Sequence, residues 1–479
     1  MLKPLRPKQI EHLAHYMKNP RTANLSDPAT GKTASLNMWM YYLWAEKKTR
    51  SVFAMPGSLF TQNKASFFKF THFKPEDIAI VIGTPEKRKK IMESDAKVFI
   101  VSFDFFKPYN DNKKRTSRPA DFEYLKQVHP DVDCCVVDEF HMGYANFESM
   151  RTKWWINYVH KMFSVVMATG TEIDGKLSTV YPIIHIIEPR YYYNYRAFLN
   201  EHAIMDEYKR PMGWVKAHKV KAILEKHCVR ATFEEVHGEE KVEVIVDVCD
   251  MSPPHRQFYK DFEETNSIEL EKEFLDTQSG GEVILRARQI LHHPETFEKK
   301  FELGKDEKIK VHIAAAIAAN KRLVIFSPFI PEQERLVKVA QKMGARAGLI
   351  NGTVAVGAKR DKVSNQFINH ELDVLVASPA TVGVGFDWNF IDIMVFTTLD
   401  YKDSSFVQGY RRGVRGEREK PLIVYVLKYK STMVEARTFK IIEEKMQLAA
   451  EINPKKRVFN FTQPEKSKLT TGKMRLSQL

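Results

Sequence analysis

The sequence has few cysteines and no long apolar run. Its four cysteines, Cys134, Cys135, Cys228 and Cys249, show neither metal-ligand spacing nor a disulfide framework, which favours a reducing compartment. The first residues, MLKPLRPKQI, lack the apolar core of a secretory signal, and no apolar stretch is long enough to span a bilayer. We therefore expect a cytoplasmic protein with no membrane partner.

Balanced charge is also missing. The chain carries 74 Lys and Arg against 60 Asp and Glu, a net charge of +14. Because Lys and Arg displace counterions from phosphates, this excess favours a polyanionic partner. A basic protein that binds no nucleic acid is the alternative.

The length of 479 residues predicts two or three domains. Short apolar segments alternate with amphipathic stretches over residues 1–200 and again over 306–452, which predicts two α/β domains with parallel sheets. A helical linking or insert region is predicted at 201–305, apart from an alternating segment at 241–248, and a basic tail at 453–479. The predicted strands are 51–54, 78–82, 98–102, 134–137 and 164–168 in the first domain, and 323–327, 346–350, 374–378, 393–397 and 422–427 in the second.

A phosphate-binding loop is predicted at residues 26–33, SDPATGKT, which precede a helical stretch. Backbone N–H groups at the start of a helix bind phosphate oxygens. We expect Lys32 to neutralise the β- and γ-phosphates of ATP, and the Thr33 hydroxyl to ligate Mg²⁺. Ser26 stands where such loops have their first glycine. The other nucleotide-binding candidates are Asp27, Ala29, Thr30, Gly31 and Ala34.

Two adjacent carboxylates follow the apolar run at 134–137. Asp138 is expected to hold the magnesium ion, and Glu139 to polarise the attacking water. An acidic turn without a catalytic role is the alternative for such a pair alone. A phosphate-binding loop upstream of it favours ATP hydrolysis.

An arginine-rich segment, QGYRRGVRG, spans residues 408–416 in the second α/β domain. Arginines supplied from outside the phosphate-binding loop stabilise the charge that develops on the γ-phosphate. Gln408, Arg412 and Arg415 are therefore the catalytic candidates of this domain. If they act on ATP bound to the first domain, hydrolysis is coupled to relative domain motion.

These segments together resemble the ordered motif series of the superfamily 2 helicases, over about residues 1–450. The resemblance implies two RecA-like domains, and it makes Gln9 in LRPKQ the adenine contact. VFAMPGSLF at 52–60 and FIVSF at 99–103 resemble nucleic-acid-contacting motifs. Gly385 and Asp387 belong to a segment similar to motif five, which places them at the nucleotide. The residues expected to couple hydrolysis to nucleic-acid contacts are His141, Thr169 and Thr171.

Three further segments resemble signatures of the SWI/SNF-type branch: MSPPHRQFY at 251–259, LRARQILHHP at 285–294 and TMVE at 432–435. This resemblance implies a DNA partner, since members of the branch track duplex DNA, and makes the middle region an extension of both motor domains. The length and the domain plan of the chain are also similar to those of the branch-migration helicases of T-odd coliphages. These likenesses imply a monomeric ATP- and Mg²⁺-dependent helicase or translocase that acts on duplex and branched DNA in recombination, repair or replication.

Nucleic-acid contacts are expected from hydroxyl, amide and basic side chains that bond phosphates without reading bases. An ordinary solvated residue is the alternative at each position. The candidates are Ser58, Gln62, Asn63, Ser102, Thr353, Lys359 and Arg360.

Three other functions stay open from the sequence. The chain could be an ATP-dependent RNA helicase, because the 2′-OH contacts that distinguish RNA are not readable here. It could be a nucleic-acid-binding scaffold with a vestigial ATPase, although Lys32, Asp138, Glu139 and Arg412 argue against that. It could also be the motor part of a restriction or remodelling complex.

Overall fold

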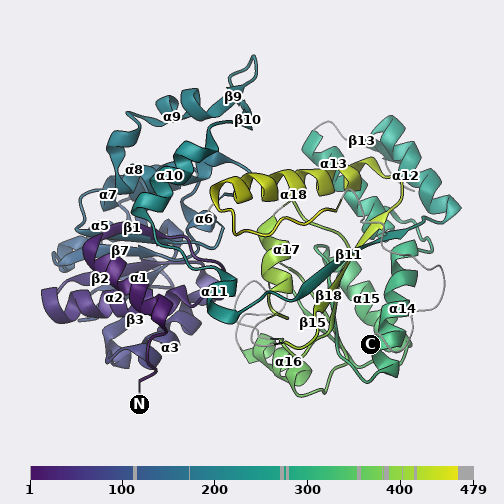
Figure 1. Cartoon of the computed structure of the whole chain (residues 1–479), viewed down its shortest axis with the longest axis horizontal. Coiled ribbons are helices and arrows are strands. Elements are labelled where there is room, and N and C mark those ends of the chain that lie inside the picture. The colour runs from purple at the N-terminus through teal and green to yellow at the C-terminus, as the bar shows by residue number, and fades with distance from the viewer. Residues whose placement is uncertain are drawn as a thin grey trace. The chain divides into compact units, whose positions relative to one another are not determined.

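The chain forms two compact units in a computed structural model (Figure 1). The structure describes residues 2–111, 116–171, 173–269, 274–276, 280–352, 358–379, 381, 388–401, 403–414 and 418–461. Unit 1 comprises residues 1–238 and 447–457, and unit 2 comprises residues 239–446 and 458–479. The predicted middle region is thus shared between the units.

Unit 1 is built on a six-stranded sheet in which every neighbouring pair is parallel. Its strands are short and rich in apolar or β-branched residues, as expected where helices cover both faces of a parallel sheet. In sheet order they are β1 (Arg21–Asn24), β8 (Ser164–Ala168), β7 (Val132–Val137), β2 (Arg50–Ala54), β4 (Val98–Val101) and β3 (Ile78–Ile80).

Side chains of unit 1 alternate between two apolar clusters, one on each face of this sheet. In β7, Cys134 packs with Trp39 in one cluster, whereas Cys135 packs with Val165 in the other. Both thiols are free and fully buried. Burial raises the pKa of Cys134 to about 11, so the thiol stays protonated and acts as a small apolar group.

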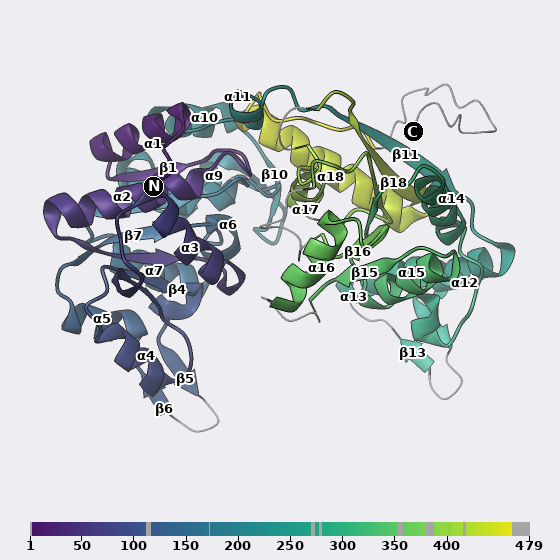
Figure 2. The same cartoon turned by 90° about the horizontal axis from the view of Figure 1, so that it is seen from below.

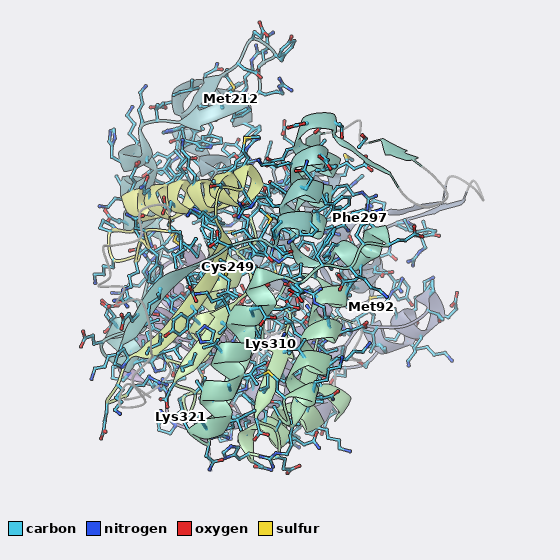
Figure 3. All side chains as sticks on the ribbon, turned by 90° about the vertical axis from the view of Figure 1, so that its right-hand side faces the viewer. Met92, Met212, Cys249, Phe297, Lys310 and Lys321 are labelled. Carbon is cyan, nitrogen blue, oxygen red and sulfur yellow. The ribbon has the colours of Figure 1, made fainter. Side chains whose placement is uncertain are left out.

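Besides its sheet, the described part of unit 1 has two small hairpins, and helices connect its strands. The hairpin of β9 (Ala203–Met205) and β10 (Pro211–Trp214) projects beyond α9 and α10 in Figure 1, and Figure 3 labels its exposed Met212. In Figure 2 a second hairpin, β5 (Tyr109–Asp111) with β6 (Thr116–Arg118), lies beside α4 and α5. The main helices are α1 (Pro7–Lys18), α2 (Lys32–Lys47), α3 (Phe60–Phe70), α4 (Pro85–Met92), α5 (Asp121–Val128), α6 (Phe140–Gly143), α7 (Met150–Val159), α8 (Tyr181–Ile187), α9 (Tyr195–His202), α10 (Ala217–His227) and α11 (Phe233–His237).

Unit 2 repeats the plan with a second all-parallel, six-stranded sheet. The alternating segment near 241–248 forms its edge strand, which pairs with β18 along eight residues. In sheet order the strands are β11 (Val242–Cys249), β18 (Leu422–Tyr429), β17 (Ile393–Phe396), β14 (Leu323–Phe326), β16 (Val374–Ala377) and β15 (Ala347–Ile350). The main helices are α12 (Pro253–Thr265), α13 (Gly280–His292), α14 (Gly304–Ala318), α15 (Ile330–Lys342), α16 (Ala358–Ile368), α17 (Asp403–Tyr410) and α18 (Met433–Ile452).

The predicted fold class, two RecA-like parallel-sheet domains with helices in the region between them, is confirmed by these two sheets. All ten predicted strands are strands in the structure. Within the described ranges, no helix combines the length and the apolar character that a bilayer crossing requires. In the described part of the predicted tail, Asn453 and Phe461 are buried, and Phe461 packs against Phe406 and Phe439.

A buried ionic cluster in unit 2 joins the three segments that resemble SWI/SNF signatures. The Glu435 carboxylate pairs with Lys305 and accepts hydrogen bonds from the Tyr429 backbone N–H (2.7 Å) and the Thr398 hydroxyl (3.1 Å). His292 lies between this carboxylate and Glu332. Burial alone would raise the pKa of Glu435, but Lys305 and His292 outweigh it and lower the pKa to about 2.

Tyr259 in the first signature completes this convergence, because its hydroxyl accepts a hydrogen bond from the Val434 N–H (3.5 Å). His255, also in the first signature, links α12 to the second signature through a hydrogen bond with the Ile290 carbonyl of α13 (2.9 Å). The signature-like segments of unit 2 therefore hold its helices on the sheet.

We predict that Glu435→Ala destabilises the protein by about 3–5 kcal/mol, because it leaves the Lys305 ammonium buried without its carboxylate. Urea unfolding followed by circular dichroism measures the loss. Glu444→Ala is the matched control on the same helix, since Glu444 is 59% exposed and pairs with Lys440 at 3.8 Å, a contact worth less than about 1 kcal/mol. Equal losses in the two variants would contradict the assignment.

Candidate nucleotide-binding and nucleic-acid-binding sites

The phosphate-binding loop leaves the carboxyl end of β1 and opens α2, which begins at Lys32. Two loop residues, Ala29 (φ 70°) and Gly31 (φ 86°), have left-handed backbone conformations that turn the chain into the helix. The Lys32 ammonium is buried and donates to the carbonyls of Ser26 (2.8 Å) and Asp27 (3.0 Å). The loop thus brings a positive charge and the start of a 16-residue helix to one place.

Gln9 lies against this loop. Its side-chain N–H donates to the Gly31 carbonyl (3.1 Å), and its side-chain oxygen accepts from the Arg6 N–H (2.9 Å). A Cβ at Gly31 would lie 2.4 Å from the Gln9 amide nitrogen. The predicted adenine contact therefore also supports the loop, and Gly31 is required both for its backbone angle and for the space that Gln9 fills.

The acidic pair follows β7, two strands away from β1 in the sheet. Asp138 is buried, and burial together with the neighbouring Glu139 raises the pKa of its carboxyl well above the usual range, against the pull of Lys32. Glu139 has a left-handed backbone (φ 53°) and is the N-cap residue of α6. The chain thus turns sharply after the strand and presents two carboxylates where ligands bind in parallel α/β sheets.

The three residues predicted to couple hydrolysis to nucleic-acid contacts are brought together. His141 Nδ1 lies 2.9 Å from the Thr169 hydroxyl, which in turn donates to the Thr171 carbonyl (2.9 Å). His141 is also 3.5 Å from a Glu139 carboxylate oxygen. A continuous polar path therefore runs from the acidic pair after β7 to the turn after β8.

The residues present fit magnesium. Thr33 and Asp138 offer oxygen ligands of the kind that Mg²⁺ prefers. Burial and the neighbouring Glu139 raise the pKa of the Asp138 carboxyl, so a cation bound there would offset a negative charge that the site disfavours. No group of three or more His, Cys, Asp or Glu side chains among the described residues forms a metal cage. Mg²⁺ is usually bound through one or two carboxylates together with substrate phosphates.

In unit 2, α17 carries Gln408, which is partly buried, and the turn after it carries Arg412, which is buried. The Arg412 carbonyl accepts from the Trp388 N–H (2.8 Å), and Arg411 forms an ion pair with Glu240 (2.7 Å). These contacts fix the turn on unit 2. The predicted residues Arg415, Gly385 and Asp387 lie outside the described residues.

The nucleic-acid candidates of unit 1 follow β2, which is the neighbour of β7 in the sheet, and β4, which is the neighbour of β2. Ser58, Gln62 and Ser102 are exposed. Ser102 lines a cavity of about 1170 Å³ together with Arg88, Lys107 and Arg118. This basic cavity carries four cationic side chains against two carboxylates, because Arg151, Asp104 and Asp121 also line it; Arg88 and Arg118 pair with Asp121, and Arg151 pairs with Asp104.

Asn63 is the exception among these candidates. It is buried, and its amide donates to the Leu59 carbonyl (3.2 Å) one turn earlier in α3. The prediction of a nucleic-acid contact at Asn63 is therefore wrong, because its side chain belongs to the interior of unit 1.

In unit 2, Arg360 is partly buried and donates to the Asn351 carbonyl (3.3 Å). Lys359 lies in α16, and Thr353 lies outside the described residues.

Sequence reasoning missed the contacts behind the phosphate-binding loop. Residues 229–237, here called the backing segment, hydrogen-bond to the loop along its length, and His12 of α1 lies 3.3 Å from the Ser26 hydroxyl. The backing segment is 200 residues away in sequence and has no phosphate-binding motif. The one available signal was the polar character of Thr22, Asn24 and Ser26, which are unusual residues for a fully buried strand end.

Two parallel sheets, a phosphate-binding loop and an acidic strand end define the class of RecA-like motor domains. The family model described as the SNF2-related domain matches residues 11–296, more than half of the chain. The chain therefore belongs to the SNF2-related family.

Two solved structures are similar to the chain. The helicase domain of Pyrococcus furiosus Hef shares 15% identity and a TM-score of 0.51, with 90% of this chain and 98% of that chain covered. The SWI2/SNF2 ATPase core of Sulfolobus solfataricus, in complex with dsDNA, shares 18% identity and a TM-score of 0.40, with 94% of each chain covered. No curated protein sequence matched. The Hef likeness supports the helicase-core fold.

We predict that Gly31→Ala lowers stability by at least about 1 kcal/mol, because a side chain at φ 86° is strained and displaces the Gln9 amide. Thermal unfolding measures the loss. Gly57→Ala is the control, since its added Cβ meets nothing within 4 Å. If Gly31→Ala unfolded like the wild type, the described loop geometry would be contradicted.

Proposed function

We propose that this chain is an ATP-dependent DNA translocase that moves on duplex DNA and remodels branched DNA. The observation that carries the proposal is the meeting of the Lys32 loop with Asp138 and Glu139 at one edge of the unit 1 sheet, in a member of the SNF2-related family. Neither a binding scaffold nor a vestigial ATPase requires that full set of groups.

In this proposal, each group at the edge of the sheet has one role in ATP hydrolysis. Lys32 leaves its carbonyl partners for the β- and γ-phosphates, and the N–H groups that open α2 bind the same oxygens. Thr33 and Asp138 would hold Mg²⁺, which would supply positive charge at the phosphates. Glu139 orients and polarises the attacking water, and its proximity to His141 (3.5 Å) holds the carboxylate in place.

The arginines of unit 2 complete the reaction in this proposal. Arg412 and Arg415 stabilise charge on the γ-phosphate, with Gln408 as a further contact, so turnover requires both units. His141, Thr169 and Thr171 carry the state of the γ-phosphate to the turns that face nucleic acid. Motion of the units during turnover is then tied to nucleic-acid contacts.

DNA is the proposed track. Ser58, Gln62 and Ser102, with the basic cavity beside Ser102, supply sequence-independent phosphate contacts. Membership in the SNF2-related family supports duplex DNA as the track. Fork regression and branch migration are the proposed outcomes, because a motor that tracks one duplex arm of a junction moves the branch point.

We predict that Lys32→Ala and Glu139→Gln each lower DNA-stimulated ATP turnover at least about a hundredfold. Glu139→Gln retains ATP binding, since the amide keeps the shape of the carboxylate but not its charge. Phosphate release and binding of a fluorescent ATP analogue measure the two properties. Glu148→Gln, at an exposed position in the same unit, is the matched control with unchanged turnover. Normal hydrolysis by either site variant would contradict the assignment.

A further inference from the structure

The backing segment extends the sheet pairing of β1 into the phosphate-binding loop. Val229 and Asn24 form a parallel bridge, in which the Val229 N–H donates to Ala23 (3.0 Å) and the Leu25 N–H donates to Val229 (2.9 Å). Two residues later the Asp27 N–H donates to the Ala231 carbonyl (2.9 Å). The loop therefore has a strand-like partner on its first half, although no element of the sheet continues there.

Side chains of the loop add to these backbone bonds. The Ser26 hydroxyl accepts from the Ala231 N–H (2.8 Å), and the Asp27 carboxylate accepts from the Phe233 N–H (3.0 Å). Further along, a ring nitrogen of His237 lies 3.0 Å from the Ala29 carbonyl. Ser26 stands where phosphate-binding loops have glycine, and glycine has no hydroxyl with which to make this bond.

Behind Ser26, the polar groups of α1 and β1 form a fully buried network. The Asn24 amide donates to the Tyr16 hydroxyl (2.6 Å) and to His12 Nδ1 (3.1 Å), and its oxygen accepts from the Ser26 N–H (3.1 Å). Because Nδ1 accepts, the neutral ring carries its proton on Nε2, which donates to the Ser26 hydroxyl (3.3 Å). Burial, with Lys32 nearby, lowers the pKa of His12 to about 4, so the ring stays neutral. Ser26 thus has fixed partners on both sides.

The opposite side of the backing segment contacts the C-terminal part of unit 1. Arg230 donates to the Ile452 carbonyl (3.2 Å), and Glu235 pairs with Lys455 (2.9 Å). Ile452 is itself buried in the unit 1 core. The chain passes to unit 2 at 238/239, directly after the backing segment, and again at 446/447 and 457/458, on either side of residues 447–457. Every covalent connection between the units therefore leaves from structure that is bonded to this one segment.

We propose that the backing segment couples the phosphate-binding loop to the chain connections between the units, and that Ser26 is the positioning residue at its centre. The inference rests on the proposed ATP site. It adds a second way in which bound nucleotide influences unit 2, separate from the arginines of that unit. Nucleotide phosphates that draw Lys32 away from the Ser26 and Asp27 carbonyls change the loop that the backing segment holds. The change then reaches residues 229–237 through hydrogen bonds, and residues 447–457 through the Arg230–Ile452 hydrogen bond and the Glu235–Lys455 ion pair.

Hydrogen–deuterium exchange on the full chain tests this coupling, with and without a non-hydrolysable ATP analogue and Mg²⁺. In the wild type we expect nucleotide to slow exchange in residues 24–34 and also in 229–237 and 447–457. In Ser26→Ala and Ser26→Gly, slowing is expected to stay confined to the loop, and analogue binding to weaken about three- to tenfold, the effect of one lost hydrogen bond. The glycine variant is the sharper test, because it restores the residue common in such loops and is nevertheless predicted to bind more weakly.

Ser164→Ala is the matched control, since Ser164 is equally buried and hydrogen-bonded, to Trp39 and Pro20, at the amino end of β8. Ser164→Ala is expected to lose about as much thermal stability as the Ser26 variants. It is expected to keep the wild-type nucleotide affinity and the wild-type pattern of hydrogen–deuterium exchange. Protection limited to 24–34 in the wild type, or undiminished affinity in both Ser26 variants, would overturn the coupling and leave the ATP site intact. Absence of any nucleotide-dependent protection or binding in the wild type would instead overturn the proposed function, and the coupling with it.

Discussion

Hydrogen bonds between the parallel strands β1, β8 and β7 fix where the phosphate-binding loop and the acidic pair lie. Parallel strands end at the same edge of a sheet, so the loop after Asn24, the turn after Ala168 and the carboxylates after Val137 share one edge. A shift of one residue in either pairing would turn the side chains to the opposite face. The full burial of these strands on both faces is what makes such a shift costly.

This edge also orders the functions that the chain is proposed to combine. Nucleotide groups follow β1 and β7, the His141–Thr169 contact bridges β7 and β8, and the exposed Ser58 and Ser102 follow β2 and β4. The residues proposed to bind nucleotide, to couple hydrolysis and to contact nucleic acid therefore follow strands that are neighbours in the sheet. In unit 2 the buried cluster around Glu435 and Lys305 holds α13, α14 and α18 on the sheet.

The sequence was sufficient for the strands that are apolar and continuous, such as β7 and β8, and for the local motifs that follow them. β1 was not predicted, because RTAN is short and polar. Its polar groups bond to α1 and to the His227 carbonyl, contacts that a local sequence pattern does not reveal. The backing segment was missed for the same reason, since its role depends on hydrogen bonds across 200 residues. Asn63 was predicted to contact nucleic acid, but helix periodicity in α3 turns its side chain into the interior of unit 1.

Stimulation of ATP hydrolysis by different nucleic acids tests the central claim most directly. Purified protein is assayed alone and with single-stranded DNA, duplex DNA, forked DNA, a four-way junction and RNA, with Glu139→Gln as the blank. A DNA motor that remodels branches predicts strong stimulation by duplex, forked and four-way DNA and little by RNA. Equal or greater stimulation by RNA would contradict the DNA track, and the absence of stimulation by every nucleic acid would contradict the motor itself.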